Sequence, residues 1–284
     1  MVINKNTKFL IIGLGLLGGS YARGLTGKGY HVDAITKNEA DVEYALKHKI
    51  VKSATTEVTE EILRSADIII FALYPAVFIE WIETYGKLLK PGTLITDVTG
   101  VKGCIVEKIQ DMLPPLVEFI SAHPMAGREV YGVENSNERI FYGANYIVVP
   151  TKRNTDEGIE CCKRIAEILG FGKICELSPE GHDEMIGFVS QLTHCIAVAL
   201  MTCYEHEELE KYTADSFRDL TRIANINENM WSELFLMNKP ALIRQMELFK
   251  GEFDKMYTYL KEENREGMKE MMRTSTERRK KFDI

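Results

Sequence analysis

Three glycines near the N-terminus have the spacing of a phosphate-binding turn. Gly13, Gly15 and Gly18 lie in GLGLLGGS, between an apolar run and a helix-like segment. In that context the first glycine allows a tight turn, the second lets the backbone approach a pyrophosphate, and the third lets helix and strand pack closely. The helix N-terminus then offers free N–H groups to the phosphates. The pattern predicts a dinucleotide-binding turn, and the alternative is an ordinary glycine-rich connection.

The end of the second predicted strand bears on which dinucleotide is bound. NAD sites place an Asp or Glu there, about 20 residues after the glycines, to bind the ribose 2′-hydroxyl. Here Thr36 and Lys37 occupy the end of the strand, and Asp33 comes too early. A hydroxyl followed by a cation suits a 2′-phosphate, which favours NADP, with NAD as the alternative if Lys37 is an ordinary surface lysine. We also expect three leucines to contact the cofactor: Leu16, Leu17 and Leu73.

A histidine lies where a substrate would meet such a cofactor. His123 ends the strand-like run 118–123, and open α/β sheets bind ligands at the carboxyl ends of their strands. Neutral imidazole, with an unperturbed pKa of about 6.5, can accept a proton near pH 7. His123 is therefore a candidate general base, although a lone histidine is more often structural. Among the others only His194 has a comparable context, whereas His182 lies in a polar segment and receives no role.

These residues need a scaffold of alternating strands and helices. We expect strands at 9–15, 32–36, 68–73, 93–98, 118–123 and 146–150, and helices at 17–28, 39–47, 59–64 and 76–89. This alternation predicts an α/β Rossmann-type doubly wound parallel sheet. Later segments look purely helical: 180–205, 207–224, 228–236, 239–263 and 264–282. We therefore predict a dinucleotide-binding domain over 1–176 and an all-α domain over 177–284, whose first helix Ser178 could cap.

Composition argues against several other classes of protein. The 284 residues include 35 Lys and Arg against 42 Asp and Glu, and a net charge of −7 disfavours nucleic-acid binding. We find no signal peptide and no apolar run near the roughly 18–20 residues of a membrane helix, so we expect a cytoplasmic protein. The six cysteines lack CxxC spacing, which indicates reduced thiols. No Cys or His pair has the spacing of a metal site, so no metal is expected.

Four motifs in order along the chain resemble the prephenate/arogenate dehydrogenase family of tyrosine biosynthesis. They are GLGLLGGS, DVTGVKG at 97–103, HPMAGRE at 123–129, and FRDLTRIA at 217–224 followed by MW at 230–231. The resemblance implies a helical domain that forms a homodimer, and oxidation of prephenate or arogenate by NAD(P)+. A hydride leaves the 4-hydroxyl carbon, the ring carboxylate departs as CO2, and the ring becomes aromatic. The sequence does not distinguish the two substrates. The length favours a monofunctional enzyme, without a fused chorismate mutase or ACT domain.

The resemblance also implies roles for individual residues. His123 accepts the proton of the substrate hydroxyl, and Arg222 binds a substrate carboxylate. Asp219 lies three residues before Arg222, so on a helix it could orient the guanidinium. A structural ion pair is the alternative, and Arg218 and Arg244 are competing cations.

Three further residues complete the implied substrate site. His194 and Glu129 contact the substrate, and Trp231 lines the pocket, although His194 or Trp231 could equally be buried packing residues. Rival classes are 3-hydroxyacid dehydrogenases, pyrroline-carboxylate-type reductases and a non-enzymatic NADP-binding sensor. The hydroxyacid type uses a catalytic lysine in its helical domain, and 190–194 contains none.

The loop at 97–102 departs from the family pattern. Many members have a serine before Val-Lys, where its hydroxyl supports the catalytic histidine, but this chain has Gly100. The neighbouring Thr99 could supply a hydroxyl, so we include it as a weaker catalytic candidate. Lys102, which follows, is expected to be solvated or to lie on the phosphate side.

Overall fold

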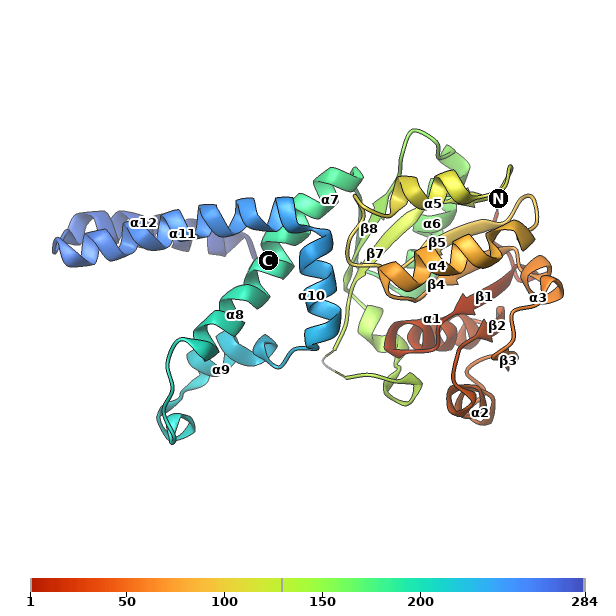
Figure 1. The fold of residues 1–284 in the computed structure, drawn as a ribbon, viewed down its shortest axis with the longest axis horizontal. Helices are drawn as coiled ribbons and strands as arrows, with labels where there is room; N and C mark the ends of the chain where they lie inside the picture. Colours follow the sequence, from red (N-terminus) through yellow and green to blue (C-terminus); the bar gives the residue numbers. More distant parts are fainter. Residues whose placement is uncertain (1, 129, 283–284) are drawn as a thin grey trace.

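Six parallel strands form the larger of two sheets in this computed structural model, which describes residues 2–128 and 130–282 (Figure 1). The strand order β3-β2-β1-β4-β5-β6 changes direction between β1 and β4, the point at which such sheets bind ligands. The predicted Rossmann-type sheet is therefore confirmed. Its strands are β1 (Lys8–Ile12), β2 (His31–Ile35), β3 (Ser53–Thr55), β4 (Ile68–Phe71), β5 (Leu94–Asp97) and β6 (Glu118–Phe119). β3 was not anticipated.

Helices cover both faces of this sheet. Alternate residues of a strand point to opposite faces, and in β1 Phe9 packs into one buried cluster while Leu10 packs into the other. The helices α1 (Leu16–Gly27) and α6 (Asp156–Leu169) contribute to the first cluster. The second cluster lies under α3 (Glu60–Ser65), α4 (Pro75–Tyr85) and α5 (Val106–Met112). α2 (Glu39–Lys47) follows β2.

A second, three-stranded sheet corrects the expected strand arrangement. β7 (Ser121–Met125) pairs antiparallel with β8 (Asn145–Val149), which pairs parallel with β9 (Lys173–Glu176). The predicted strand 118–123 is therefore split between two sheets, and 146–150 does not extend the parallel sheet. The chain leaves the first sheet after Ile120, and the Ala122 N–H instead donates to the Asp97 carboxylate at 3.0 Å. An apolar run indicates a strand but not its partner or its direction.

Helices predominate between residues 179 and 282. They are α7 (Pro179–Ile186), a π-helical turn (Gly187–Leu192), α8 (Thr193–Thr202), α9 (Asp215–Thr221), α10 (Glu228–Met237), α11 (Lys239–Lys261) and α12 (Arg265–Arg279). Ser178 caps α7, because its Oγ accepts the Gly181 N–H at 3.1 Å. The expected helix 207–224 is broken into α9 and two short 3₁₀ turns. α11 and α12 pack together as an arm that points away from the nucleotide-binding sheet (Figure 1).

The stretch Pro179–Thr202 corrects an expectation drawn from composition. It is 24 residues long with a mean hydropathy of 1.6 over its most apolar window, enough by length and composition to cross a membrane. We expected no such run, but residues 185–202 contain no charged side chain. Only 28% of the window is buried, and Phe188 and Val189 are among its exposed apolar side chains. The stretch also carries buried polar residues of the candidate site, so it packs as part of the folded protein.

Candidate active site

The glycine turn has the geometry that a pyrophosphate requires. Gly13 has φ +97°, and a Cβ there would lie 2.5 Å from the Ala72 carbonyl oxygen. A Cβ at Gly18 would lie 1.8 Å from the Gly13 carbonyl oxygen, so the helix and the turn touch. At Gly15 a Cβ would meet nothing within 4 Å, and no side chain caps the N-terminus of α1. The turn therefore leaves open space in front of free N–H groups, and these residues fit the NAD(P) phosphates.

The predicted ribose-binding residues lie at the end of β2. Thr36 is buried and its N–H donates to the Thr55 carbonyl at 3.1 Å, whereas Lys37 is exposed. The Thr36 hydroxyl lies 3.5 Å from a carboxylate oxygen of Asp41, which also accepts the Asn38 amide at 3.0 Å. Sequence reasoning missed Asp41, because it belongs to the first turn of α2 and not to the strand.

The three leucines surround the same turn. Leu16 and Leu17 open α1, and Leu73 follows β4 with its side chain against Gly13. Their positions are compatible with contacts to a cofactor bound at the turn.

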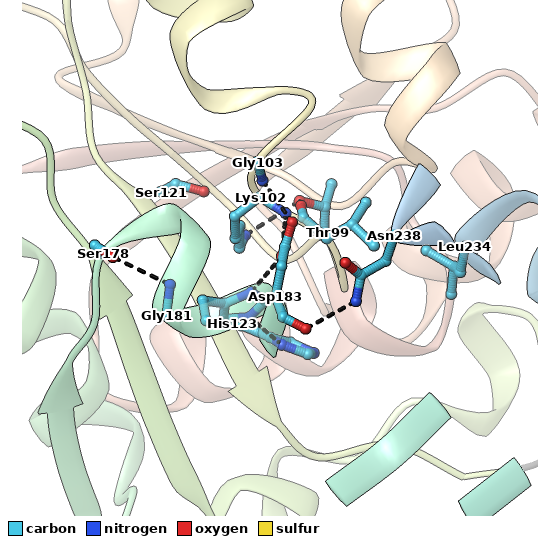
Figure 2. A network of polar contacts seen from close by, with 12 residues as sticks. Thr99, Lys102, Gly103, Ser121, His123, Ser178, Gly181, Asp183, Leu234 and Asn238 are labelled. Carbon is cyan, nitrogen blue, oxygen red and sulfur yellow. Dashed lines mark hydrogen bonds and ion pairs between the residues drawn. The ribbon is translucent and has the colours of Figure 1, made fainter. Parts of the chain in front are cut away.

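His123 lies in β7 and forms a chain of hydrogen bonds into the helical half of the protein. Its Nδ1 lies 2.9 Å from Nε2 of His182, whose Nδ1 lies 2.8 Å from Oδ1 of Asp183 (Figure 2). Because the carboxylate only accepts, neutral His182 donates from Nδ1 and accepts at Nε2. His123 therefore donates from Nδ1, and its Nε2 carries the lone pair. That atom is the one able to take a proton from a substrate.

The surroundings keep both rings neutral. Burial lowers the pKa of His123 well below its usual value of 6.5, and the neighbouring His182 and Lys102 lower it further. Burial also lowers the pKa of His182, although the hydrogen bond to Asp183 opposes that effect. Near pH 7 His123 is thus available as a proton acceptor.

Sequence reasoning gave His182 no role, whereas the structure buries it completely behind the candidate base. The sequence feature that could have indicated this role is the adjacent His182–Asp183 pair near the predicted boundary between the two domains. A polar segment at a seam can be buried by the other domain, which its composition does not reveal.

Asp183 also holds the loop between β5 and α5. Its carboxylate accepts the N–H of Lys102 at 2.8 Å and the N–H of Gly103 at 2.7 Å (Figure 2). A Cβ at Gly103 would approach the same carboxylate to 2.9 Å, so a glycine suits this close contact. One helical-domain side chain therefore supports both the histidine pair and the loop beside it.

Lys102 is fully buried, so the expectation of a solvated lysine is wrong. Its Nζ donates to the Asp97 carboxylate at 2.8 Å and to the Ala122 carbonyl at 2.7 Å. Asp97 also accepts the Ser121 hydroxyl at 2.7 Å. Burial lowers the pKa of Lys102, and the facing Asp97 raises it. The pair ties the end of β5 to β7, the strand that carries His123.

Thr99 contacts this pair, and the next residue, Gly100, borders His123. The buried Thr99 hydroxyl contacts the Asp97 carboxylate and lies 3.1 Å from Lys102 Nζ and 3.1 Å from the Val101 carbonyl oxygen, so it binds the buried pair and its own loop. A catalytic role for Thr99 stays a prediction. A Cβ at Gly100 would lie 3.8 Å from the Leu234 methyl groups and 4.0 Å from His123 Cε1. The position where many relatives place serine therefore borders the base directly.

Other predicted substrate-binding residues lie on the helical half. His194 stacks on Trp231 with ring centroids 3.7 Å apart, and its Nδ1 lies 2.8 Å from the Ser190 carbonyl oxygen. Asp219 is exposed in α9, and Arg222 begins the 3₁₀ turn after that helix, so the two do not share one regular helix. Glu129 lies outside the described residues.

The two competing cations each face a carboxylate. Arg218 faces Asp215 at 3.7 Å, and Arg244 pairs with Glu184. Within residues 2–128 and 130–282, no group of three His, Cys, Asp or Glu side chains is placed to hold a metal ion.

A nucleotide-binding sheet with an open glycine turn, joined to helices that orient a neutral histidine, defines a two-domain NAD(P)-dependent dehydrogenase. The chain belongs to the prephenate dehydrogenase family. The family model of the nucleotide-binding domain matches residues 21–174, and that of the dimerization domain matches residues 178–274. Membership of this family sets the chain apart from the 3-hydroxyacid dehydrogenases and the pyrroline-carboxylate-type reductases.

Named relatives and a solved structure agree with this assignment. The chain is 28% identical over 277 residues to the prephenate dehydrogenase of Bacillus subtilis, covering 95% of this chain and 74% of the relative. It is 31% identical over 256 residues to that of Lactococcus lactis, covering 88% and 70%. The structure resembles Aquifex aeolicus prephenate dehydrogenase in complex with hydroxyphenyl propionate and NAD+, with a TM-score of 0.89, 28% identity, and coverage of 97% and 98%.

Proposed function

We propose that this protein oxidises prephenate to 4-hydroxyphenylpyruvate and CO2 with NAD(P)+, in tyrosine biosynthesis. The observation that carries the proposal is the neutral His123, held by His182 and Asp183 so that its Nε2 can accept a proton. The relatives named prephenate dehydrogenase support the choice of substrate. Steady-state turnover of prephenate, compared with arogenate, tests it.

The roles follow from the geometry and from the needs of the reaction. Bound NAD(P)+ supplies the hydride acceptor. His123 takes the proton of the substrate hydroxyl, which favours loss of hydride from the same carbon. Arg222 binds a substrate carboxylate, and the stacked His194 and Trp231 line the flat ring. We also propose that Glu129 contributes to this polar site.

Replacing Arg222 tests the carboxylate contact. We expect Arg222→Ala to raise the KM for the substrate by about tenfold or more, because a charge-assisted bidentate contact is lost. The KM for the cofactor should change little. Arg218→Ala is the matched control, since Arg218 faces Asp215 on the exposed side of α9. An unchanged substrate KM in Arg222→Ala would move the role to another cation.

We propose NADP as the preferred cofactor, because the Thr36 hydroxyl and the exposed Lys37 amine lie where a 2′-phosphate would bind. Asp41 opposes this preference by its charge, since it lies beside Thr36. Lys37→Ala should raise the KM for NADP by about tenfold and spare NAD, and Asp41→Asn should lower the KM for NADP. A wild-type KM for NAD at least about tenfold below that for NADP would contradict the proposal.

We propose that the helical domain, 177–284, forms a homodimer in the cytoplasm. An exposed apolar row runs along α11, and apolar rows of this kind on a monomer mark association surfaces. Its members are Met246, Phe249, Phe253, Tyr257 and Leu260. Sedimentation equilibrium should give the mass of a dimer for the wild type and of a monomer for Phe253→Glu. A monomeric wild type would contradict the proposal.

A further inference from the structure

The helix α10 contacts three parts of the site. Trp231 stacks on His194 of α8. Leu234 lies 3.8 Å from the position of a Cβ at Gly100, which itself borders His123. Between them, Glu233 reaches a different part of the nucleotide-binding domain. The helix α10 therefore contacts a proposed substrate-binding residue, the loop beside His123, and the nucleotide-binding domain.

The Glu233 contact is made with the N-terminus of α4. Its Oε1 accepts the N–H of Ala76 at 3.1 Å. Pro75, the first residue of α4, has no N–H, and neither a side-chain cap nor an acidic residue occupies that first turn. Ala76 is therefore the first donor of the helix, and a carboxylate is stabilised there by the helix dipole. The cap of α4 comes from the other half of the protein.

The segment that Glu233 holds also supports the glycine turn. Ala72 and Leu73 pack against Gly13, and the chain passes directly from them into α4. Tyr74 lies on the same segment, and its pKa is raised by burial and further by the nearby Tyr131 and Glu233. Glu233 therefore connects α10, the helix that carries Leu234, to the segment whose residues Ala72 and Leu73 pack against the glycine turn.

We propose that Glu233 is a positioning residue that closes the helical domain onto the nucleotide-binding domain. By fixing α10 to the start of α4, it holds Leu234 beside Gly100, which borders His123, and it holds Trp231 against His194. The inference rests on the proposed function, because it assigns the closed arrangement to the dehydrogenase reaction. Because small displacements of the reacting groups lower the reaction rate strongly, a contact that fixes their positions affects turnover.

Two replacements at Glu233 test the contact. Glu233→Ala removes the acceptor and should lower kcat/KM for the substrate by about tenfold, while the dissociation constant for reduced cofactor stays close to that of the wild type. Glu233→Gln keeps an oxygen that can accept the Ala76 N–H and should recover most of the activity. Glu228→Gln, an exposed carboxylate on the same helix, is the charge-matched control and should behave as the wild type.

Amide hydrogen exchange supplies a measurement that does not need turnover. In Glu233→Ala the amides of Ala76 and α10 should exchange faster, whereas those of β1 and β4 should be unchanged. Unchanged exchange at Ala76 and α10, or an unchanged kcat/KM in an active enzyme, would overturn the inference. A loss of kcat/KM in Glu228→Gln equal to that in Glu233→Ala would also overturn the inference. A wild type that turns over neither substrate would instead contradict the proposed function, and the exchange data would still decide the contact.

Discussion

His123→Asn should lower kcat by at least about a hundredfold, because a positioned general base contributes about 10²–10⁴ to the rate. Asparagine can still donate toward His182, but it offers no basic nitrogen to the substrate. The glycine turn lies in another part of the sheet, so the dissociation constant for the cofactor should be nearly unchanged. Single-turnover kinetics with saturating cofactor, together with titration of the reduced cofactor, measure the two quantities separately.

The pH profile gives a second test of the same base. Burial and the neighbouring His182 and Lys102 hold the pKa of His123 well below 6.5. Since the neutral ring is the active form, kcat/KM should stay level from pH 7 down to the neighbourhood of that lowered pKa and should fall below it. The unfolded chain binds the proton more readily, so stability should already decrease as the pH drops from 6.5 toward the lowered pKa.

A matched histidine controls for general effects of the replacement. His48→Asn changes an exposed ring at the end of α2 and should leave kcat unchanged. Near-wild-type kcat in His123→Asn would remove this residue from the mechanism.

Lys102→Met should destabilise the protein by about 3–5 kcal/mol, the usual cost of removing one partner from a buried ion pair. The methionine side chain fills similar space but leaves the Asp97 carboxylate without its cation. Because the pair joins β5 to β7, the loss should also disturb His123. The midpoint of urea unfolding, followed by circular dichroism, measures the change in stability.

The double variant shows whether charge is the cause. Asp97→Asn with Lys102→Met removes both charges, and it should be more stable than Lys102→Met alone. Lys108→Met is the control, because Lys108 and Glu83 form an exposed pair worth about 0–1 kcal/mol. If Lys102→Met unfolds at the same urea concentration as Lys108→Met, the buried pair does not support the fold as described.

Features encoded by neighbouring residues could be predicted from the sequence. The glycine turn needs only a strand, three correctly spaced glycines and a helix, and all of these are local. The placement of His123 at the carboxyl end of a parallel strand was wrong, because His123 is the third residue of β7, which belongs to the second sheet. The parallel sheet followed from the alternation of apolar runs and amphipathic segments, which reports burial on both faces of the strands.

Features that depend on distant partners could not be predicted in this way. The burial of Lys102 depends on Asp97 and on a carbonyl of β7, and a lysine in a loop is ordinarily solvated. The role of His182 depends on its docking against His123, 59 residues earlier. The separate sheet of β7, β8 and β9 depends on strand pairing, which a short apolar run does not specify.

The most direct test of the central claim is the initial rate of nicotinamide reduction with prephenate and with arogenate, each with NADP and with NAD. We expect turnover of prephenate, a higher kcat/KM for prephenate than for arogenate, and loss of that turnover in His123→Asn. No reduction with either substrate, or reduction with arogenate alone, would contradict it.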